Sequence, residues 1–243
     1  MARVDDLIKC MASQLRDGDV VYVGLSSIQA LLAVMLARAW GRDVEFLNVA
    51  EIYNPEDVVI TPSSGDPFTF KGGVGIVTSL DSFDLARRGL LDVMFFSAAQ
   101  VDRRGNMNLS VIGPYEKPRV RLPGGAAAAY LYRRARRVIM WLMEHSRRNL
   151  VERVDFITAP GPTRNGPELV VCTPMALFRF DPEVNELVLE GVYEDLSLGD
   201  VIDNMGFKPR VREPLTRLRK ATEEEINILN RWDPNGLRYG RRP

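Results

Sequence analysis

Four polar side chains follow a buried strand that the apolar run at residues 92–98 predicts, and they alternate with apolar residues. They are Gln100, Asp102, Asn106 and Asn108. Gly105 supplies the sharp turn between the two pairs. Because open α/β sheets bind ligands where their strands end, these groups could hold a polar substrate. A polar hairpin at a sheet edge would produce the same pattern without any ligand.

Glycine-rich and small-residue turns give two further candidate binding elements. Gly124, Gly125 and Ala126 lead into an alanine-rich helix, where backbone amides can face an anionic group. Gly24 and Ser26 lie between a strand predicted at residues 20–23 and a helix predicted at residues 28–40, a place that can also cradle an anion. Close helix packing at the first turn and helix capping by Ser26 or Ser27 at the second are the alternatives.

The string from Ala98 to Ser110, followed by Gly113 and by Pro123–Ala126, resembles the beta subunit of family I CoA-transferases, especially the glutaconate CoA-transferase type. Further matching segments are Met143–Arg148, Asp155–Gly161, Phe178–Asp181 and Asp200–Phe207. The resemblance implies a CoA-transferase-like α/β fold in a single domain over residues 1–243. It implies an open, mostly parallel sheet flanked by helices, with antiparallel strands toward the C-terminus.

The resemblance also implies a reaction and a partner. In the family, a glutamate attacks an acyl-CoA thioester, passes through an acyl anhydride and becomes a glutamyl-CoA thioester that hands CoA to an acceptor acid. The chain would work with an alpha subunit, with coenzyme A as a substrate and no bound cofactor. The residues expected to contact CoA or substrate are Gly24, Ser26, Asn48, Gln100, Asn106, Gly124, Gly125 and Ala126. The glycine-rich turn is expected beside the thioester.

The place of the nucleophile departs from the family pattern. There the glutamate ends the strand that matches residues 44–49 and is followed by a small residue and a glycine, whereas this chain has no such motif. An ungapped match puts the nucleophile near Asn48 or Val49, and Glu51 is the carboxylate that follows. Glu51 is the candidate catalytic residue, expected near the turn at Gly124, and an ordinary solvated loop acid is the alternative.

Three functional alternatives therefore stay open. With Glu51 in place, the chain is a transferase subunit that moves CoA between an acyl-CoA and a carboxylic acid. Without it, the chain resembles subunits that hydrolyse CoA thioesters or open rings in catabolic pathways. A sugar-phosphate isomerase-like or metabolite-binding protein has the same architecture, although the five lysines lie in no phosphate-binding loop.

Periodicity predicts the elements that carry these residues. An amphipathic helix opens the chain, further helices are predicted at 80–91, 198–205 and 223–232, and the last has Thr222 as its N-cap with Glu225 three residues on. Later strands are predicted at residues 138–143, 156–158, 169–172 and 187–189. A long irregular stretch spans Asn54 to Gly75, and the residues from Tyr239 onward are expected to form a loose tail.

Composition excludes several classes of function. Lys and Arg number 32, as do Asp and Glu, so no net field attracts nucleic acid or an anionic membrane. Two cysteines, Cys10 and Cys172, and a single histidine, His145, argue against a disulfide framework and a metal site. His145, after a predicted central strand, is expected to have a structural role. With no signal-like start and no run of about 18 apolar residues, a cytoplasmic protein is expected.

Overall fold

The computed structural model describes residues 3–49, 51–56, 58–64, 66, 68 and 72–240. The chain divides into two compact units. The first comprises residues 1–95 and 220–243, and the second comprises residues 96–219. A single domain over residues 1–243 stays a prediction.

In the first unit, strands are arranged in the order β5-β1-β2-β3-β4. Their bounds are β1 (Asp19–Val23), β2 (Val44–Asn48), β3 (Ile52–Tyr53), β4 (Gly75–Ile76) and β5 (Val93–Ser97). β1 is parallel to both β2 and β5, and the short β3 and β4 return antiparallel beside β2. Helices α2 (Ile28–Ala39) and α3 (Ser79–Arg87) occur in the connections between the parallel strands, as expected for a wound α/β sheet.

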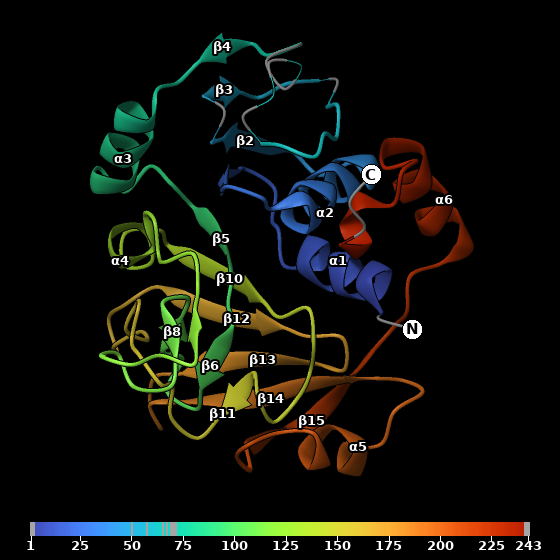
Figure 1. The fold of residues 1–243 in the computed structure, drawn as a ribbon. Coiled ribbons are helices and arrows are strands. Elements are labelled where there is room, and N and C mark those ends of the chain that lie inside the picture. The colour runs from blue at the N-terminus through green and yellow to red at the C-terminus, as the bar shows by residue number, and fades with distance from the viewer. Residues whose placement is uncertain are drawn as a thin grey trace. The chain divides into compact units, whose positions relative to one another are not determined.

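The helices of this unit cover α2, which is the most buried of them. α1 (Val4–Ser13), α2 and α6 (Glu223–Trp232) pack together, and the 3-10 helix η2 (Leu237–Tyr239) contacts α2 as well (Figure 1). The eight residues from Ala30 to Ala37 are all buried, because neighbours cover α2 on opposite sides. The capping box predicted at Thr222 and Glu225 begins α6, so that prediction is confirmed.

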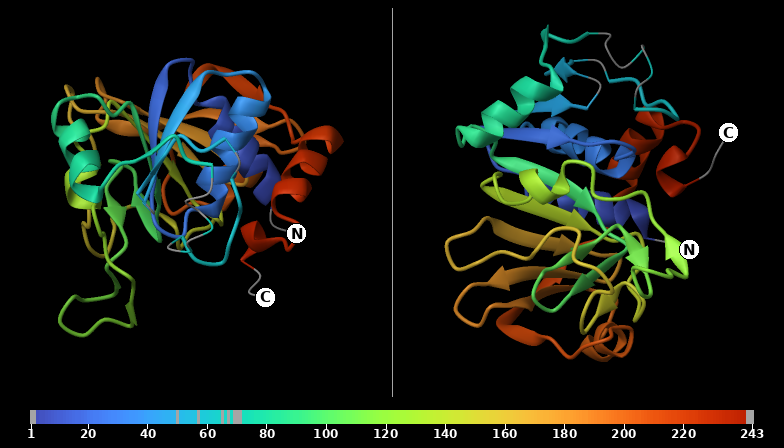
Figure 2. Two further views of the ribbon diagram at one scale, coloured as in Figure 1. Left: turned by 90° about the horizontal axis from the view of Figure 1, so that it is seen from above. Right: turned by 60° about the vertical axis from the view of Figure 1, so that its left-hand side comes forward.

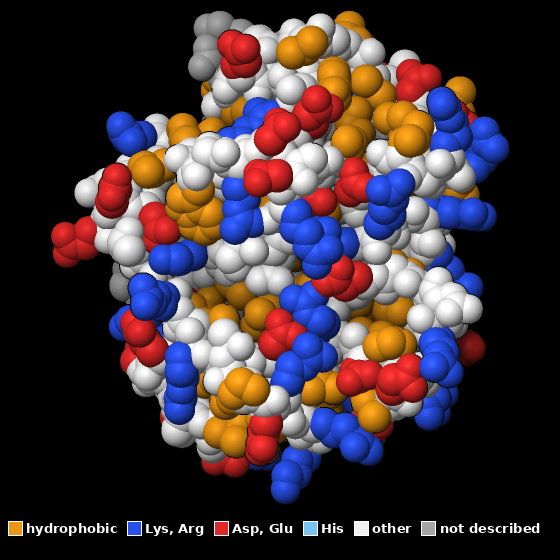
Figure 3. All heavy atoms as spheres, turned by 180° about the vertical axis from the view of Figure 1, so that it is seen from behind, with side chains coloured by type: hydrophobic (Ala, Val, Ile, Leu, Met, Phe, Trp, Pro, Cys, Tyr) orange, Lys and Arg blue, Asp and Glu red, His pale blue; other side chains and the backbone are white. Residues whose placement is uncertain are grey.

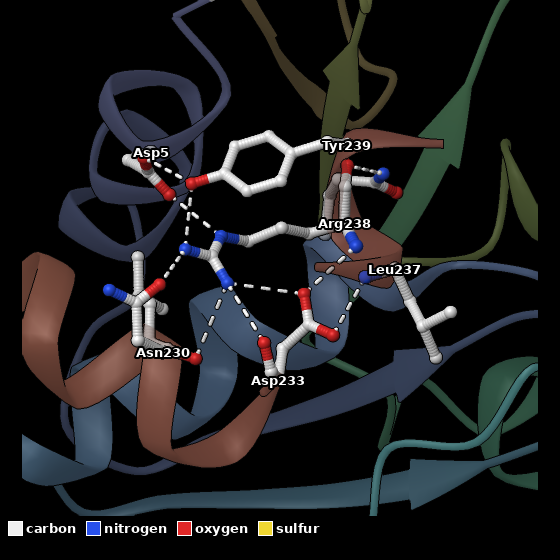
Figure 4. A network of polar contacts seen from close by, with 8 residues as sticks. Asp5, Asn230, Asp233, Leu237, Arg238 and Tyr239 are labelled. Atoms are coloured by element: carbon white, nitrogen blue, oxygen red, sulfur yellow. Dashed lines mark hydrogen bonds and ion pairs between the residues drawn. The ribbon is translucent and has the colours of Figure 1, made fainter. Parts of the chain in front are cut away.

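The end of the described chain is bound to its beginning. The fully buried Arg238 guanidinium lies 2.8 Å from an Asp5 oxygen and 3.2 Å from an Asp233 oxygen, and the Tyr239 hydroxyl donates to Asp5 at 2.8 Å (Figure 4). Burial alone would lower the pKa of Arg238, but the hydrogen bond to Asp5 and its charge outweigh that effect and raise it. The predicted loose tail is therefore wrong at Tyr239, because these polar bonds fix it, while residues 241–243 lie outside the described residues.

In the second unit, the strand order is β15-β14-β13-β12-β10. The bounds are β10 (Arg137–Trp141), β12 (Glu168–Cys172), β13 (Ala176–Asp181), β14 (Glu186–Tyr193) and β15 (Arg210–Leu218). β10 and β12 are parallel, β12 to β14 are antiparallel, and β15 is parallel to β14. This confirms the α/β class with antiparallel strands toward the C-terminus. β13 and β15 were not predicted.

Smaller elements complete this unit. Strands β6 (Gln100–Asp102), β7 (Met107–Asn108) and β11 (Leu150–Val151) form a three-stranded sheet, and β8 (Val111–Ile112) pairs with β9 (Val120–Arg121). The loop of the β8–β9 hairpin extends away from the other strands of the unit (Figure 2). The helices are α4 (Ala128–Leu131) and α5 (Leu198–Asp203). The strand predicted at residues 156–158 is wrong, since only an isolated bridge between Ala159 and Met107 forms there.

Charged side chains on the surface are of both signs. Across β10 to β14 of the second unit, Arg137 pairs with Glu168, and Arg179 pairs with both Glu168 and Glu190. The face shown in Figure 3 likewise has basic side chains interspersed with acidic ones. This mixture agrees with the zero net charge of the sequence. Among the described residues, no helix is long and apolar enough to cross a membrane.

Candidate functional site

Three of the predicted site residues line one pocket of the first unit. β1 and β2 are parallel with Val23 opposite Asn48, so the two strands end side by side. The pocket at their ends includes Gly24, Ser26 and Asn48, together with the loop at residues 59–64. The amide of Ser26 donates to the Ser64 hydroxyl oxygen at 3.3 Å, which ties this loop to the start of α2. The structure therefore assembles a pocket where the sequence predicted a binding site.

The residues before α2 do not cap it through their side chains. Ser27 is the N-cap residue, but its hydroxyl donates to the carbonyl of Leu25 at 3.0 Å instead of accepting from the helix. Ser26 has a φ of +52°. Ser27 thus occupies the N-cap position, as one alternative had it, but its hydroxyl makes no capping bond to the helix.

Glu51 lies in the tight turn between β2 and β3. Its amide donates to the carbonyl of Asn48 at 2.8 Å, and its own carbonyl accepts from the Val77 amide at 3.0 Å. The carboxylate is half-buried and accepts from the Ser79 amide at 2.9 Å and from the Ser79 hydroxyl at 3.0 Å. The candidate nucleophile therefore sits at the beginning of α3, where a negative charge is favoured.

The backbone of this turn can be compared with the motif of glutamate, small residue and glycine in the family that the sequence resembles. Glu51 has a φ of +65°, a conformation that favours glycine. Val49 directly follows β2, and its amide donates to the Val23 carbonyl at 3.0 Å. In this register Val49 takes the place of the glutamate, and Ala50, which lies outside the described residues, is the small residue. Glu51 then takes the place of the glycine.

Tyr22 is the buried neighbour of Glu51. Burial, and to a lesser extent the negative charge of Glu51, raises the pKa of the Tyr22 hydroxyl. The hydroxyl therefore stays protonated at neutral pH. Tyr22 is in β1, paired with Leu47 on one side and Met94 on the other.

In the second unit, Asp102 and Asn106 form the centre of a hydrogen-bonded scaffold. Asp102 accepts from the Asn106 amide at 3.1 Å and from its side-chain nitrogen at 2.9 Å. The Asn106 side-chain oxygen accepts from the amide of Gly161 at 2.8 Å. The other end of the string is similar, since Gln100 Oε1 accepts from Asn108 at 2.8 Å and from the Asp155 amide at 3.1 Å. The string is therefore a hairpin of β6 and β7 whose polar side chains form a hydrogen-bonded scaffold.

Segments distant in sequence meet on this scaffold. A side chain at Gly161 would come within 2.0 Å of the Arg104 carbonyl oxygen, so only glycine fits there. The Thr158 hydroxyl oxygen accepts from the Leu109 amide at 2.8 Å and lies 2.7 Å from the Ser110 hydroxyl. The segment at residues 155–161, which resembles the family as the central string does, therefore packs directly on that string.

The glycine-rich turn packs on the same scaffold. Gly124 has a φ of +92° and Ala126 a φ of +43°, and the Gly124 amide donates to the Leu109 carbonyl at 2.8 Å. A Cβ at Gly125 would lie 2.4 Å from the Thr158 methyl group. Within the described part of the chain, no acceptor is found for the amides of Gly125 and Ala126. These two amides are thus available to an oxygen of a ligand.

His145 is built into the core of the second unit. Its Nε2 lies 3.0 Å from the Val201 carbonyl and its Nδ1 lies 2.9 Å from the Thr173 hydroxyl. Burial lowers its pKa to about 4, although the bond to Val201 opposes this. The ring is therefore neutral at pH 7, with its proton on Nε2, because the carbonyl can only accept. The structural role expected for His145 is confirmed by these bonds.

Sequence reasoning missed Ser79, Tyr22 and Thr158, whereas the loop at residues 59–64 lies in the irregular stretch noted at Asn54 to Gly75. Only Ser79 had a local signal, because Thr78 and Asp81 form a capping box that places Ser79 first in α3. The other contacts depend on which strands lie side by side. Among the described residues, no three His, Cys, Asp or Glu side chains gather as a metal site.

Comparison with known proteins gives the family. The family model described as Coenzyme A transferase matches residues 4–204. The B-type subunit of the 3-oxoadipate CoA-transferase of Pseudomonas knackmussii is 27% identical, over 90% of this chain and 88% of its own. The B-type subunit of the glutaconate CoA-transferase of Acidaminococcus fermentans is 26% identical, over 81% of this chain and 79% of its own.

A solved structure agrees with that match. The crystal structure of the decarboxylase AibA/AibB has a chain that is 30% identical and superimposes with a TM-score of 0.88, covering 98% of this chain and 97% of its own. The relatives thus include transferase subunits and a decarboxylase on one fold. With its family match spanning residues 4–204, this chain belongs to the coenzyme A transferase family.

Proposed function

We propose that this chain is the beta subunit of a heteromeric CoA-transferase that moves CoA between an acyl-CoA and a carboxylic acid. The family match and the two relatives that are B-type transferase subunits support this proposal. The single observation that carries it is the pocket where β1 and β2 end, next to the turn that bears the half-buried carboxylate of Glu51.

In the proposed mechanism, a Glu51 oxygen attacks the thioester carbonyl carbon, the carbon–sulfur bond breaks, and CoA leaves as a thiolate. The thiolate then attacks the glutamyl carbonyl of the resulting anhydride, which releases the donor acid and leaves a glutamyl-CoA thioester. An acceptor carboxylate reverses these steps and takes up CoA. Hydrogen-bond donors near the developing oxyanion would lower both barriers.

The remaining site residues are proposed to bind substrate. Gly24, Ser26 and Asn48 line the pocket of the first unit. The amides of Gly125 and Ala126 suit an oxygen of CoA, with Gly124 shaping the turn. Gln100 and Asn106 are proposed to act indirectly, because their side chains are bonded within the scaffold. We propose that CoA is a substrate and that no bound cofactor is required. We also propose that the chain works in the cytoplasm with an alpha-type subunit.

The turn geometry favours a second candidate function. Glu51 has the backbone conformation that suits the glycine of the family motif, and its carboxylate is engaged by two donors of Ser79. In that register no glutamate stands at the nucleophile's place. The chain would then act on an acyl-CoA without a glutamyl-CoA thioester, as a hydrolase, a ring-opening subunit or, like the decarboxylase AibA/AibB, a decarboxylase.

Chemical trapping distinguishes the two candidates. The complex with its alpha-type subunit is incubated with acyl-CoA, treated with borohydride or hydroxylamine, and mapped by peptide mass spectrometry. A transferase is expected to be labelled at Glu51. Glu51→Gln should abolish both the label and the exchange between acyl-CoA and free acid, while Glu116→Gln, at an exposed acid, should change neither. Turnover that persists in Glu51→Gln without any label would leave the second candidate.

A further inference from the structure

We propose that the pocket where β1 and β2 end binds a short, uncharged acyl group. This inference rests on the proposed function, because it names the class of acyl-CoA that the same site accepts. The pocket is lined by residues 23, 24, 26–28, 31, 48, 59–62 and 64, all of which belong to the first unit. Asn48 connects it to the turn at Glu51, whose amide donates to the Asn48 carbonyl at 2.8 Å.

The charge of the acyl group follows from the side chains of the lining. None of these lining residues is Lys, Arg, His, Asp or Glu. The polar groups are hydroxyls, as at Ser26 and Thr61, and the amide of Asn48. A carboxylate at the far end of an acyl chain would lose water here without meeting a cation among the described lining residues, which is costly. The pocket therefore selects against acyl groups that end in a second carboxylate.

The size of the acyl group follows from the walls. Val23, Ile28 and Leu31 supply an apolar surface, and Ile60 and Pro62 face them from the loop. The cavity volume is about 70 Å³. This lies below the range of about 300–1,000 Å³ found for pockets that hold drug-sized ligands. A short linear or branched acyl group fits, and a fatty acyl chain does not.

The loop that closes the pocket is held by hydrogen bonds. Ser64 accepts from the Ser26 amide at 3.3 Å, and the Thr61 hydroxyl donates to the Ser63 carbonyl at 2.7 Å. Side chains of this loop thus have a defined place opposite the end of β1. A single substitution in it should change which acyl group is accepted.

Binding of inert CoA thioethers tests the inference separately from the reaction. Titration calorimetry on the complex with the alpha-type subunit compares S-(3-methylbutyl)-CoA with S-(4-carboxybutyl)-CoA, neither of which can undergo acyl transfer. The uncharged analogue is expected to bind at least tenfold more tightly. Equal affinity, or tighter binding of the carboxylate, would overturn the inference. Because no transfer is measured, this result is independent of whether trapping finds a glutamyl thioester.

A charge placed in the pocket gives the converse test. Ile60→Arg should strengthen binding of the carboxybutyl analogue at least tenfold and weaken binding of the methylbutyl analogue. Val120→Arg, at a residue that is 49% exposed in the β8–β9 hairpin, is the matched control and should change neither. Gly24→Ala adds a Cβ to a residue of the pocket lining. The nearest atom to this Cβ is the Met94 Cε at 3.7 Å, so the fold can accept the change. This variant should weaken binding of the methylbutyl analogue about fivefold. No effect of either pocket variant would show that the acyl group lies elsewhere.

Discussion

Asp102 is a heavily bonded side chain of the polar string. One of its oxygens accepts the amides of Arg104 and Asn106 at 3.0 and 3.1 Å, and the other accepts the Asn106 side chain at 2.9 Å. The carboxylate is only 3% exposed, so these donors replace the water it loses. Its neighbour Asn106 therefore joins a buried charge to the loop at Gly161.

Asn106→Ala should lower the free energy of unfolding by about 1–3 kcal/mol, because it leaves Asp102 and the Gly161 amide each short of a partner. Urea denaturation measures the change. Asn165→Ala, at an exposed residue of the second unit, is the matched control and should stay within about 0.5 kcal/mol of the parent. Full stability and full activity in Asn106→Ala would show that these bonds contribute nothing to folding or to the site.

His145 should make stability depend on pH. Its pKa is about 4 in the folded chain against 6.5 when unperturbed, so between these values the unfolded chain binds a proton that the folded chain excludes. The contribution of the neutral His145 ring to the free energy of unfolding is fully present above pH 6.5 and is lost as the pH falls toward 4. At about 1.4 kcal/mol per pH unit, the loss is about 3 kcal/mol.

Unfolding measured from pH 7 to pH 4 tests this, and His145→Gln should flatten the slope above pH 5, where most carboxylates are still ionised. His145 is the only histidine in the chain, so its NMR signal is unambiguous. A titration midpoint near 6.5 in the folded protein would contradict the prediction.

Two loops of the second unit approach each other without room for a side chain. The Gly161 Cα lies against the backbone of Arg104 and Gly105, and the same loop donates a hydrogen bond to Asn106. This packing fixes the central string against the loop at Gly161. The loop at residues 158–161 is therefore a structural element, although it forms no strand.

Gly161→Ala should destabilise the protein by about 1–3 kcal/mol or more, because its Cβ would lie 2.0 Å from a carbonyl oxygen that cannot move freely. Gly199→Ala in α5 is the control, since the nearest atom to its Cβ is a side-chain oxygen at 3.5 Å. Thermal melting of both variants measures the difference. Equal melting temperatures would show that the loop shifts without cost.

Elements with strong local signals could be predicted from the sequence. The buried runs of β1, β2, β5 and β10 and the capping box of α6 are of this kind. β15 could not be predicted, because its residues are charged, partly exposed and interrupted by Pro214. Conversely, the apolar residues 156–158 suggested a strand, but they lie in the loop that packs on the central string.

The candidate site could be predicted only where its contacts lie close together in the sequence. The bonds within residues 100–108 join residues that are close in sequence, whereas the partners Asp155 and Gly161 are distant and could not be predicted. The contact between Glu51 and Ser79 could not be predicted either, because it requires β3 and β4 to fold back beside β2 and bring α3 to the turn. Pairing of distant short strands leaves no periodic signal in the sequence.

Arg238→Met should lower the free energy of unfolding by about 3–5 kcal/mol, because it leaves the buried carboxylate of Asp233 without its cation. Chemical denaturation measures the loss. Arg164→Met removes an ion pair with Glu183 in which both side chains are more than two-thirds exposed, so it should cost less than about 1 kcal/mol. Similar losses in both variants would contradict a stabilising role for the network in Figure 4.

The chain purified alone should show no CoA-transferase activity, because the transferase relatives it resembles are B subunits. Adding the alpha-type subunit should restore exchange between acyl-CoA and free acid. A chromatographic assay of the acyl-CoA measures this exchange. The control is the alpha-type subunit alone, which should also be inactive. Sustained turnover by the isolated chain, free of any other protein, would refute the need for a partner.

The first unit is built from two separate segments of the chain, and this affects the order in which the protein folds during synthesis. Its parts are residues 1–95 and 220–243, whereas the second unit is the continuous segment of residues 96–219. Nascent chains leave the ribosome from the N-terminus, and compact units fold as their residues become available. The second unit can fold once Arg219 has emerged, while Asp5 must wait for Arg238. The part of this protein that is synthesised first is therefore the part that completes its fold last.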